Sequence, residues 1–254
     1  MRPSGKLREI VPTAPITWSD RSFITIDIDW AHDDVLRDAI ELLDETELNV
    51  TWFVTHDTPI LARLRENPQY DLGIHPNFNW LLAGDTRGGA NAVEVVDRMM
   101  KIVPDAKCVR SHSMAQSTGL LQIFSDAGLT HDANHFVPAS SDVELKPWVL
   151  WNGMTRVPYC WEDDIFCIYR ERGIAEPDVA GTMAKKGLRV FDFHPIHLFL
   201  NTESMTRYER TRALHQDPIE LVKHRYIGNG ARSWLLELTE GIRSKISADN
   251  LARK

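Results

Sequence analysis

Cysteine is scarce in this 254-residue chain, and so is net positive charge. The three cysteines, Cys108, Cys160 and Cys167, cannot all pair with one another, and no close Cys-x-x-Cys spacing indicates a structural zinc site. Lysine and arginine total 29 against 36 aspartates and glutamates, which gives a formal charge of −7. Because binding to a phosphate backbone depends on clustered basic residues, we expect no nucleic acid partner.

Long apolar runs are also absent. No stretch approaches the roughly 18 uninterrupted apolar residues of a membrane span, and the opening MRPSGKLREIVPTAPITW lacks the apolar core of a secretory signal. We therefore expect a protein of the reducing cytoplasm without a membrane span. A Gly-x-Ser-x-Gly elbow and a glycine-rich phosphate loop are missing too, which argues against a serine α/β-hydrolase and a P-loop enzyme.

What the chain does have is an alternation of short β-branched or aromatic runs with longer segments of helical period. The pattern predicts strands at 22–28, 49–55, 70–74, 106–110, 154–157 and 188–193. Residues 1–21 are expected to form an irregular lead-in, and residues from about 216 to 254 a helical carboxyl-terminal part. We expect all of them to belong to one domain, 1–254. Such alternation predicts an α/β fold with a mostly parallel sheet, open or closed into a barrel.

Polar side chains recur directly after successive predicted strands. They are Asp29, His56, His75, Arg110 and His194. The carboxyl ends of barrel strands are where barrel enzymes assemble their active sites. Polar loops occur in every fold, but five such residues favour a barrel with a site at this edge.

Asp27 and Asp29 follow an apolar strand and alternate with Ile28, so both carboxylates are predicted to lie on one side of that strand. Two carboxylates this close disfavour each other's ionisation unless a cation or a proton intervenes. The pair is therefore a candidate for metal binding or proton transfer. The acids that follow, from Asp38 to Glu47, are typical of a solvated helix face.

His75 and Asn79 lie four residues apart after the third predicted strand, a spacing that lets two side chains reach one metal ion. Asn offers only a neutral carbonyl oxygen, and it is common in turns, where its side chain bonds the backbone. Metal binding and loop support are therefore both open for Asn79.

His194 directly follows the strand at 188–193, and His197 lies on the loop beyond it. Histidine is the side chain best suited to proton transfer near neutral pH. Arg110 and His112 form a further cluster, in which Arg110 could pair with a carboxylate at a strand end.

The order of these motifs resembles the polysaccharide deacetylase superfamily (NodB homology, carbohydrate esterase family four). The resemblance covers roughly residues 22–200 and rests on these motifs: Thr25-Ile-Asp-Ile-Asp29, Thr51-Trp-Phe-Val54, Gly73-Ile-His75 with Asn79, Arg110 and His194. The phrases HPNFN and FHPIHLFLNT are similar to a cytoplasmic branch encoded with bacterial O-antigen and surface-polysaccharide genes. The resemblance implies a distorted (β/α)7 barrel of about seven strands and one divalent metal ion.

Roles follow from the resemblance by position. It implies that Asp27 is the general base, that Asp29 is the metal carboxylate and that His75 is the first metal histidine. Asn79 stands where a second metal histidine is usual, and Arg110 matches the arginine that holds the base.

The same resemblance assigns the general acid to His194, with His197 as the rival for that role. His112 and Trp161 are further candidate site residues. Trp161 could stack on a sugar face, as Trp30 and Trp80 could, or it could pack in the core.

The implied activity is that of a metal-dependent hydrolase. It would remove the acetyl group from an acetamido sugar in a nucleotide-linked or lipid-linked precursor of a surface polysaccharide. Zinc is the expected metal, with manganese or magnesium as alternatives because an amide oxygen from Asn79 suits harder ions. Ile28 between the two aspartates and Asn79 in place of histidine both depart from the family pattern. They keep open a carbohydrate-binding protein without turnover, and hydrolysis of another amide or ester is a third hypothesis.

Overall fold

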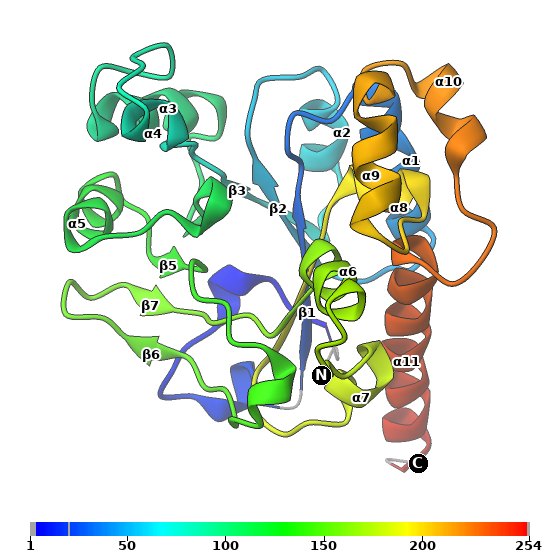
Figure 1. Ribbon diagram of the computed structural model, residues 1–254. Coiled ribbons are helices and arrows are strands. Elements are labelled where there is room, and N and C mark those ends of the chain that lie inside the picture. The colour runs from blue at the N-terminus through cyan, green and yellow to red at the C-terminus, as the bar shows by residue number, and fades with distance from the viewer. Residues whose placement is uncertain (1–3, 20, 253–254) are drawn as a thin grey trace.

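The computed structural model describes residues 4–19 and 21–252, with side chains described through Lys245. Residues 1–3 and 20 of the expected lead-in and residues 253–254 of the expected carboxyl-terminal part therefore lie outside the described residues. Within the described residues, nine strands form one sheet in the order β6-β7-β5-β4-β3-β2-β1-β9-β8, and every neighbouring pair is parallel except β6–β7 (Figure 1). The strands are β1 Ser22–Asp27, β2 Val50–Val54, β3 Tyr70–Ile74, β4 Cys108–Val109, β5 His131–Asp132, β6 Trp148–Val149, β7 Thr155–Arg156, β8 Trp161–Glu162 and β9 Arg189–Phe193.

Helices follow most strands and cover the outside of the curled sheet (Figure 1). The α-helices are α1 Asp33–Asp44, α2 Leu61–Glu66, α3 Asn79–Leu82, α4 Ala92–Ile102, α5 Thr118–Asp126, α6 Asp163–Glu171, α7 Val179–Met183, α8 Pro195–Leu200, α9 Met205–Thr211, α10 Pro218–Leu221 and α11 Ala231–Ala252. Short 3-10 helices are η1 Leu7–Glu9, η2 Pro15–Thr17, η3 His112–Met114, η4 Ala139–Ser141, η5 Arg212–Leu214 and η6 Val222–His224. None of the helices in the described part of the chain is long and apolar enough to cross a membrane.

The central strands β1, β2, β3 and β9 are the ones that the apolar runs predict, and every residue in them is buried. Continuous burial is typical of parallel strands whose two faces are both covered. The sheet has nine strands rather than about seven because residues 130–162, whose sequence pattern is weak, add several strands of only two residues.

The parallel register brings several strand ends to one edge. Asp27 pairs with Phe53 of β2, and Ile26 pairs with Phe193 of β9. Side chains that directly follow β1, β2, β3 and β9 therefore emerge close together, as the positions after the predicted strands suggested.

The amino-terminal segment is more ordered than expected, because it contains η1 and η2 and buries Leu7 and Ile10. The backbone N–H of Leu7 donates to Thr51 Oγ1 at 3.1 Å, and Arg8 Nε donates to Asp71 Oδ2 at 2.7 Å. Thr51 and Asp71 are the second residues of β2 and β3. The segment therefore packs at the amino ends of these strands, opposite the edge where the polar residues gather (Figure 1, dark blue).

The carboxyl-terminal helix α11 begins directly after a turn at residues 227–230. Asn201 shapes this turn: its Nδ2 donates to the carbonyls of Tyr226 and Gly228, and its Oδ1 accepts from Arg232 N. A Cβ at Gly230 would lie 2.1 Å from the Asn201 carbonyl oxygen, so this close approach requires glycine. From there α11 packs along α7 and α8.

Leu7→Ala is expected to lower the free energy of unfolding by about 2–5 kcal/mol, because it leaves a cavity at a fully buried position. Ile16→Ala is the matched control in the same segment, where the side chain is 66% exposed, and its effect should stay within about 0.5 kcal/mol. Urea unfolding followed by circular dichroism measures both. Equal losses in the two variants would show that the segment does not seal this end of the sheet.

Candidate active site

A cavity of about 280 Å³ opens at the carboxyl ends of the strands. Its lining includes six of the predicted site residues: Asp27, Asp29, His75, Arg110, His112 and His194. It also includes Ser111, Ser113, Met114, Tyr159, Glu162, Asp164 and Ile165. The lining does not include Asn79, His197 or Trp161.

Asp29 enters the cavity through a strained turn rather than through strand alternation. Strand β1 ends at Asp27, and Asp29 and Trp30 have φ values of 37° and 52°, in the left-handed region that non-glycine residues rarely adopt. The Trp30 N–H donates to Thr55 Oγ1 at 3.0 Å, which holds the turn against β2. Asp27 and Asp29 thus line the same cavity, but the turn after β1 brings them together and not the strand alternation that the sequence predicts.

Two imidazoles face the Asp29 carboxylate. Asp29 Oδ1 lies 3.2 Å from His75 Nε2 and 3.3 Å from His112 Nδ1. Burial by itself would raise the pKa of Asp29, but these imidazoles outweigh it and hold that pKa well below its usual range. Despite the short distances, the buried Oδ1 accepts no hydrogen bond from any residue that the structure describes. One ligand atom from each of the three residues fits within 4.8 Å of the other two, so the trio could hold a metal ion.

Arg110 lies behind Asp27 and is almost fully buried. Its Nη1 donates to Asp27 Oδ1 and Thr25 Oγ1, both at 3.0 Å, and forms an ion pair with Asp192. The guanidinium carbon lies 4.7 Å from the ring centre of Phe53 and 4.3 Å from that of Tyr159. Burial would lower the pKa of Arg110, but the two carboxylates raise it, so the side chain remains a cation.

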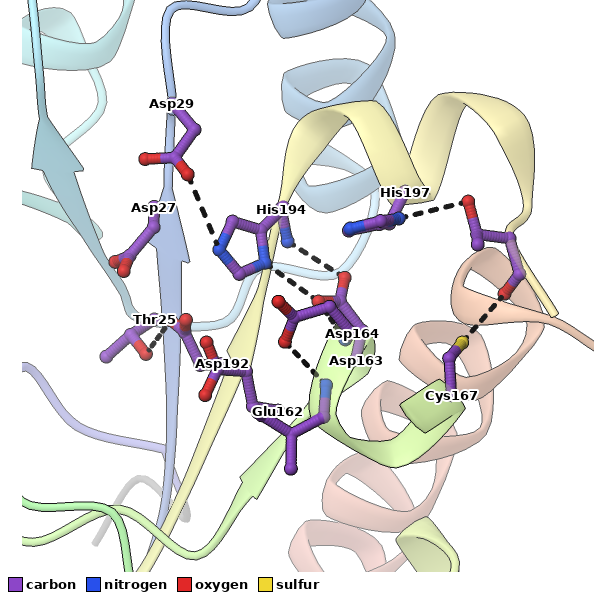
Figure 2. A network of polar contacts seen from close by, with 12 residues as sticks. Thr25, Asp27, Asp29, Glu162, Asp163, Asp164, Cys167, Asp192, His194 and His197 are labelled. Carbon is purple, nitrogen blue, oxygen red and sulfur yellow. Dashed lines mark hydrogen bonds and ion pairs between the residues drawn. The ribbon is translucent and has the colours of Figure 1, made fainter. Parts of the chain in front are cut away.

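His194 points its Nε2 into the cavity, 3.9 Å from Asp29 Oδ2 (Figure 2). Its Nδ1 lies 2.8 Å from Asp163 Oδ1, and its backbone N–H donates to Asp163 Oδ2 at 2.9 Å. Burial would lower the pKa of His194, but Asp163 and Asp164 reverse the effect and hold that pKa well above its usual range. The geometry thus fixes Nδ1 on Asp163 and turns Nε2 toward the cavity, and the raised pKa favours the protonated imidazole.

His197 lies behind His194 rather than beside the cavity. Its Nδ1 contacts Thr202 Oγ1 at 3.1 Å, and its ring centre lies 5.6 Å from that of His194 (Figure 2). Burial and the positive charge of His194 lower the pKa of His197 to about 3. This imidazole is therefore neutral and packed, which separates it from the proton-transfer position.

Two other candidates lie away from the cavity. Asn79 is the exposed first residue of the short helix α3, and its Nδ2 donates to Ser113 Oγ at 3.1 Å, so the side chain ties two loops together. Trp161 is 1% exposed and packs among the aromatic rings of Phe166, Phe193 and Trp234. The core explanation for Trp161 therefore fits the structure better than a sugar-stacking role.

Sequence reasoning missed Asp163, Asp192, Glu162 and Asp164, which all surround His194 or Arg110. Burial raises the pKa of the Glu162 and Asp164 carboxyls, and neighbouring carboxylates add to the rise for both. A signal was present in the sequence, because Glu162-Asp163-Asp164 is a run of three acids next to an apolar strand. Asp192 likewise shares the alternation of β9 with His194.

The comparison with protein families matches residues 24–212 to one described as WbmS-like polysaccharide deacetylase. The chain belongs to this family. The resemblance that the motifs predicted is confirmed. Among curated proteins, no sequence matches the chain.

The chain is also similar to solved structures. The chain is 41% identical to WbmS from Bordetella bronchiseptica, described as a candidate polysaccharide deacetylase involved in O-antigen biosynthesis, with a TM-score of 0.86 over 94% of this chain and 98% of that one. A candidate polysaccharide deacetylase from Mycobacterium smegmatis matches at 14% identity and a TM-score of 0.45, over 88% and 90% of the two chains. A family-four pseudoenzyme from Bacillus anthracis matches at 13% identity and a TM-score of 0.38, over 80% and 60%. The similarity to WbmS confirms the predicted fold class, an α/β protein with a curled sheet of the NodB deacetylase type.

Asp163→Asn is expected to lower the pKa of His194. The folded protein binds the His194 proton more tightly than the unfolded chain does, so this pair stabilises the fold fully below the unfolded pKa of about 6.5 and less as the pH rises through the folded value. The stability lost in the variant should therefore be largest below about pH 6.5 and shrink at alkaline pH.

Titration of histidine resonances by NMR and urea unfolding across pH measure the two effects. Asp178→Asn, which changes a carboxylate that caps α7, is the control and should leave His194 unchanged. An unaltered His194 titration in Asp163→Asn would contradict the assignment of Asp163 as its partner.

Proposed function

We propose that this chain is a metal-dependent hydrolase that removes the acetyl group from an acetamido sugar of a cytoplasmic surface-polysaccharide precursor, such as an O-antigen precursor. The observation that carries the proposal is the placement of Asp27 and His194 in one cavity with Asp29, His75 and His112. This arrangement provides a base, an acid and a set of metal ligands within reach of one substrate group.

Asp29, His75 and His112 would hold the ion. The buried Asp29 Oδ1 without a hydrogen bond is the observation that fits a cation, and a carboxylate with two imidazoles is a donor set that suits zinc. When bound, the ion would polarise the acyl oxygen as a Lewis acid and lower the pKa of water. His112 would take the ligand position that the sequence pattern gave to Asn79.

Asp27 acts as the general base in this proposal. Arg110 holds Asp27 Oδ1, which leaves Oδ2 to accept the proton of the water that attacks the acyl carbon. Oδ2 lies 3.5 Å from His75 Nδ1, so the base is adjacent to the ligand set without belonging to it.

His194 acts as the general acid. Asp163 holds Nδ1, so the proton on Nε2 is the one that reaches the cavity and passes to the departing sugar amine. The raised pKa of His194 keeps this proton in place at neutral pH.

A binding protein without turnover is the weaker alternative. It was motivated by Ile28 between the aspartates and by Asn79. In the structure both aspartates line the cavity and His112 stands beside Asp29, so neither departure leaves a gap in the proposed machinery.

Acetate release tests the activity directly. The zinc-loaded protein should release acetate from at least one acetamido sugar supplied free, nucleotide-linked or lipid-linked. A chelator should abolish the release and added metal should restore it. A protein that holds metal but binds sugar without releasing acetate would favour the binding alternative.

Asp27→Asn is expected to reduce the rate about 10²- to 10⁴-fold, because the variant keeps the shape of the side chain and loses the proton acceptor. Its zinc content, measured by atomic emission, should stay unchanged. Asp29→Asn is the matched comparison and should lose zinc. Loss of zinc from Asp27→Asn would show that the two aspartates have been assigned in the wrong order.

His112→Ala is expected to weaken zinc affinity by about 100-fold or more, since removal of even an outer partner of a metal ligand costs about 10- to 100-fold. Asn79→Ala should leave the zinc affinity unchanged and lower the thermal stability, because it removes the hydrogen bond to Ser113. Competition with a fluorescent zinc chelator measures both affinities. The opposite ranking of the two variants would return Asn79 to the ligand set.

A further inference from the structure

A second and larger cavity, of about 680 Å³, adjoins the candidate active site. The lining residues that bear on a ligand are Trp30, Asp57, Trp80, Arg87, Arg98 and Lys101. Trp30 connects the two cavities, because it lines this one and its ring centre lies 5.0 Å from that of His112. Trp30 therefore lies between this cavity and His112, a lining residue of the candidate active site.

Two indoles form part of its wall. Trp30 and Trp80 are each 38% exposed, which leaves indole surface open to a ligand. Arg87 lies over the ring of Trp80 at 4.2 Å and is held by Asp85, with 2.6 Å between Nη2 and Oδ2. Indole faces of this kind stack on planar groups and on apolar sugar faces.

The cavity is basic in an acidic protein. Arg98 and Lys101 are three residues apart on α4, so they lie on one face of that helix. Neither forms an ion pair with any side chain that the structure describes. Arg98 Nη1 reaches only the Arg87 carbonyl, at 3.5 Å.

Three acids lie near these cations. Asp57 is the acidic residue of the lining. Asp97 and Glu94 border the neighbouring hollow, and the Glu94 carboxylate accepts hydrogen bonds from Ala90 N and Asn91 Nδ2. Because Arg98 and Lys101 form no ion pair with these acids or with any other described side chain, both positive charges remain available to a ligand.

We propose that this cavity binds the diphosphate of a sugar diphosphate, with the sugar's acetamido group at Asp27 and His194. The inference rests on the proposed deacetylase function and assigns the part of the protein that would hold the carrier diphosphate of the precursor. A diphosphate diester carries two negative charges, which match Arg98 and Lys101. Arginine and lysine form the strong charge-assisted hydrogen bonds that phosphate oxygens accept.

A nucleoside diphosphate and a lipid diphosphate share this chemistry, and binding experiments distinguish them. The probes are UDP-N-acetylglucosamine, farnesyl-diphosphate-linked N-acetylglucosamine and free N-acetylglucosamine. Calorimetry with the zinc-loaded Asp27→Asn protein measures affinity without turnover. At least one diphosphate should bind more tightly than the free sugar, and its affinity should fall as salt is added. The diphosphate that binds more tightly identifies the carrier.

The double variant Arg98→Gln/Lys101→Gln should weaken binding of that diphosphate by about 10- to 100-fold and leave free-sugar binding unchanged. Both side chains are exposed, so the fold should survive, and thermal unfolding checks this. Lys107→Gln is the matched control, since this exposed cation precedes β4 at the opposite end of the sheet. It should change neither affinity.

Equal affinity for free and diphosphate-linked sugars would overturn the inference, and so would a double variant that binds like the parent. These results are independent of acetate release. Tight, Arg98- and Lys101-dependent diphosphate binding without acetate release would support the cavity assignment and count against the deacetylase. Acetate release together with equal affinities for free and diphosphate-linked sugars would support the deacetylase and count against the cavity assignment.

Discussion

The buried guanidinium of Arg110 is the interaction around which the candidate site is built. A cation in the interior costs several kcal/mol unless partners compensate for its lost hydration. Here Asp27 from β1 and Asp192 from β9 supply the charge, and the rings of Phe53 and Tyr159 enclose the two faces. Without that cation, two buried carboxylates from neighbouring strands would repel each other. The Arg110 side chain that orients the proposed base therefore also joins the ends of three strands. Both the stability of the fold and the proposed chemistry depend on this one group.

His194 repeats this arrangement, again as a buried cation compensated by carboxylates. Its charge faces Asp163, and Glu162 and Asp164 lie nearby with raised pKa values. A positive imidazole with a row of acids behind it complements the carboxylate with two imidazoles around Asp29. The pKa of the proposed acid His194 and that of the proposed metal ligand Asp29 are thus both shifted by buried neighbours. This fits proton transfer at fixed atoms near neutral pH.

The sequence predicts the parts of this arrangement that depend on local patterns. Apolar runs located β1, β2, β3 and β9, and the short run 106–110 located β4; the residues at the ends of these strands supplied Asp29, His75, Arg110 and His194. The pairing of Asp163 with His194 could not be predicted from the sequence, because it joins residues 31 positions apart and nothing in the local pattern specifies that contact. The backbone conformation of Asp29 could not be predicted either, because strand alternation ends at Asp27 and a positive φ in a non-glycine residue is unfavourable locally. Tertiary contacts, such as the Trp30 N–H with Thr55, make that turn stable.

The proposed third metal ligand is His112 rather than Asn79, and this difference relates the candidate active site to the neighbouring basic cavity. His75 is followed by the four-residue helix α3, whose exposed first residue is Asn79, while His112 arrives beside Asp29 on η3, where Ser113 and Met114 have positive φ values. Because His112 on η3 would supply the third ligand, Asn79 at the start of α3 does not have to face the ion. Asn79 instead fastens α3 to η3 through Ser113, and the next residue, Trp80, faces the basic cavity. If both proposals hold, the side chain that departs from the family motif supports the loop beside the wall that would hold the diphosphate, and the departure is compatible with turnover.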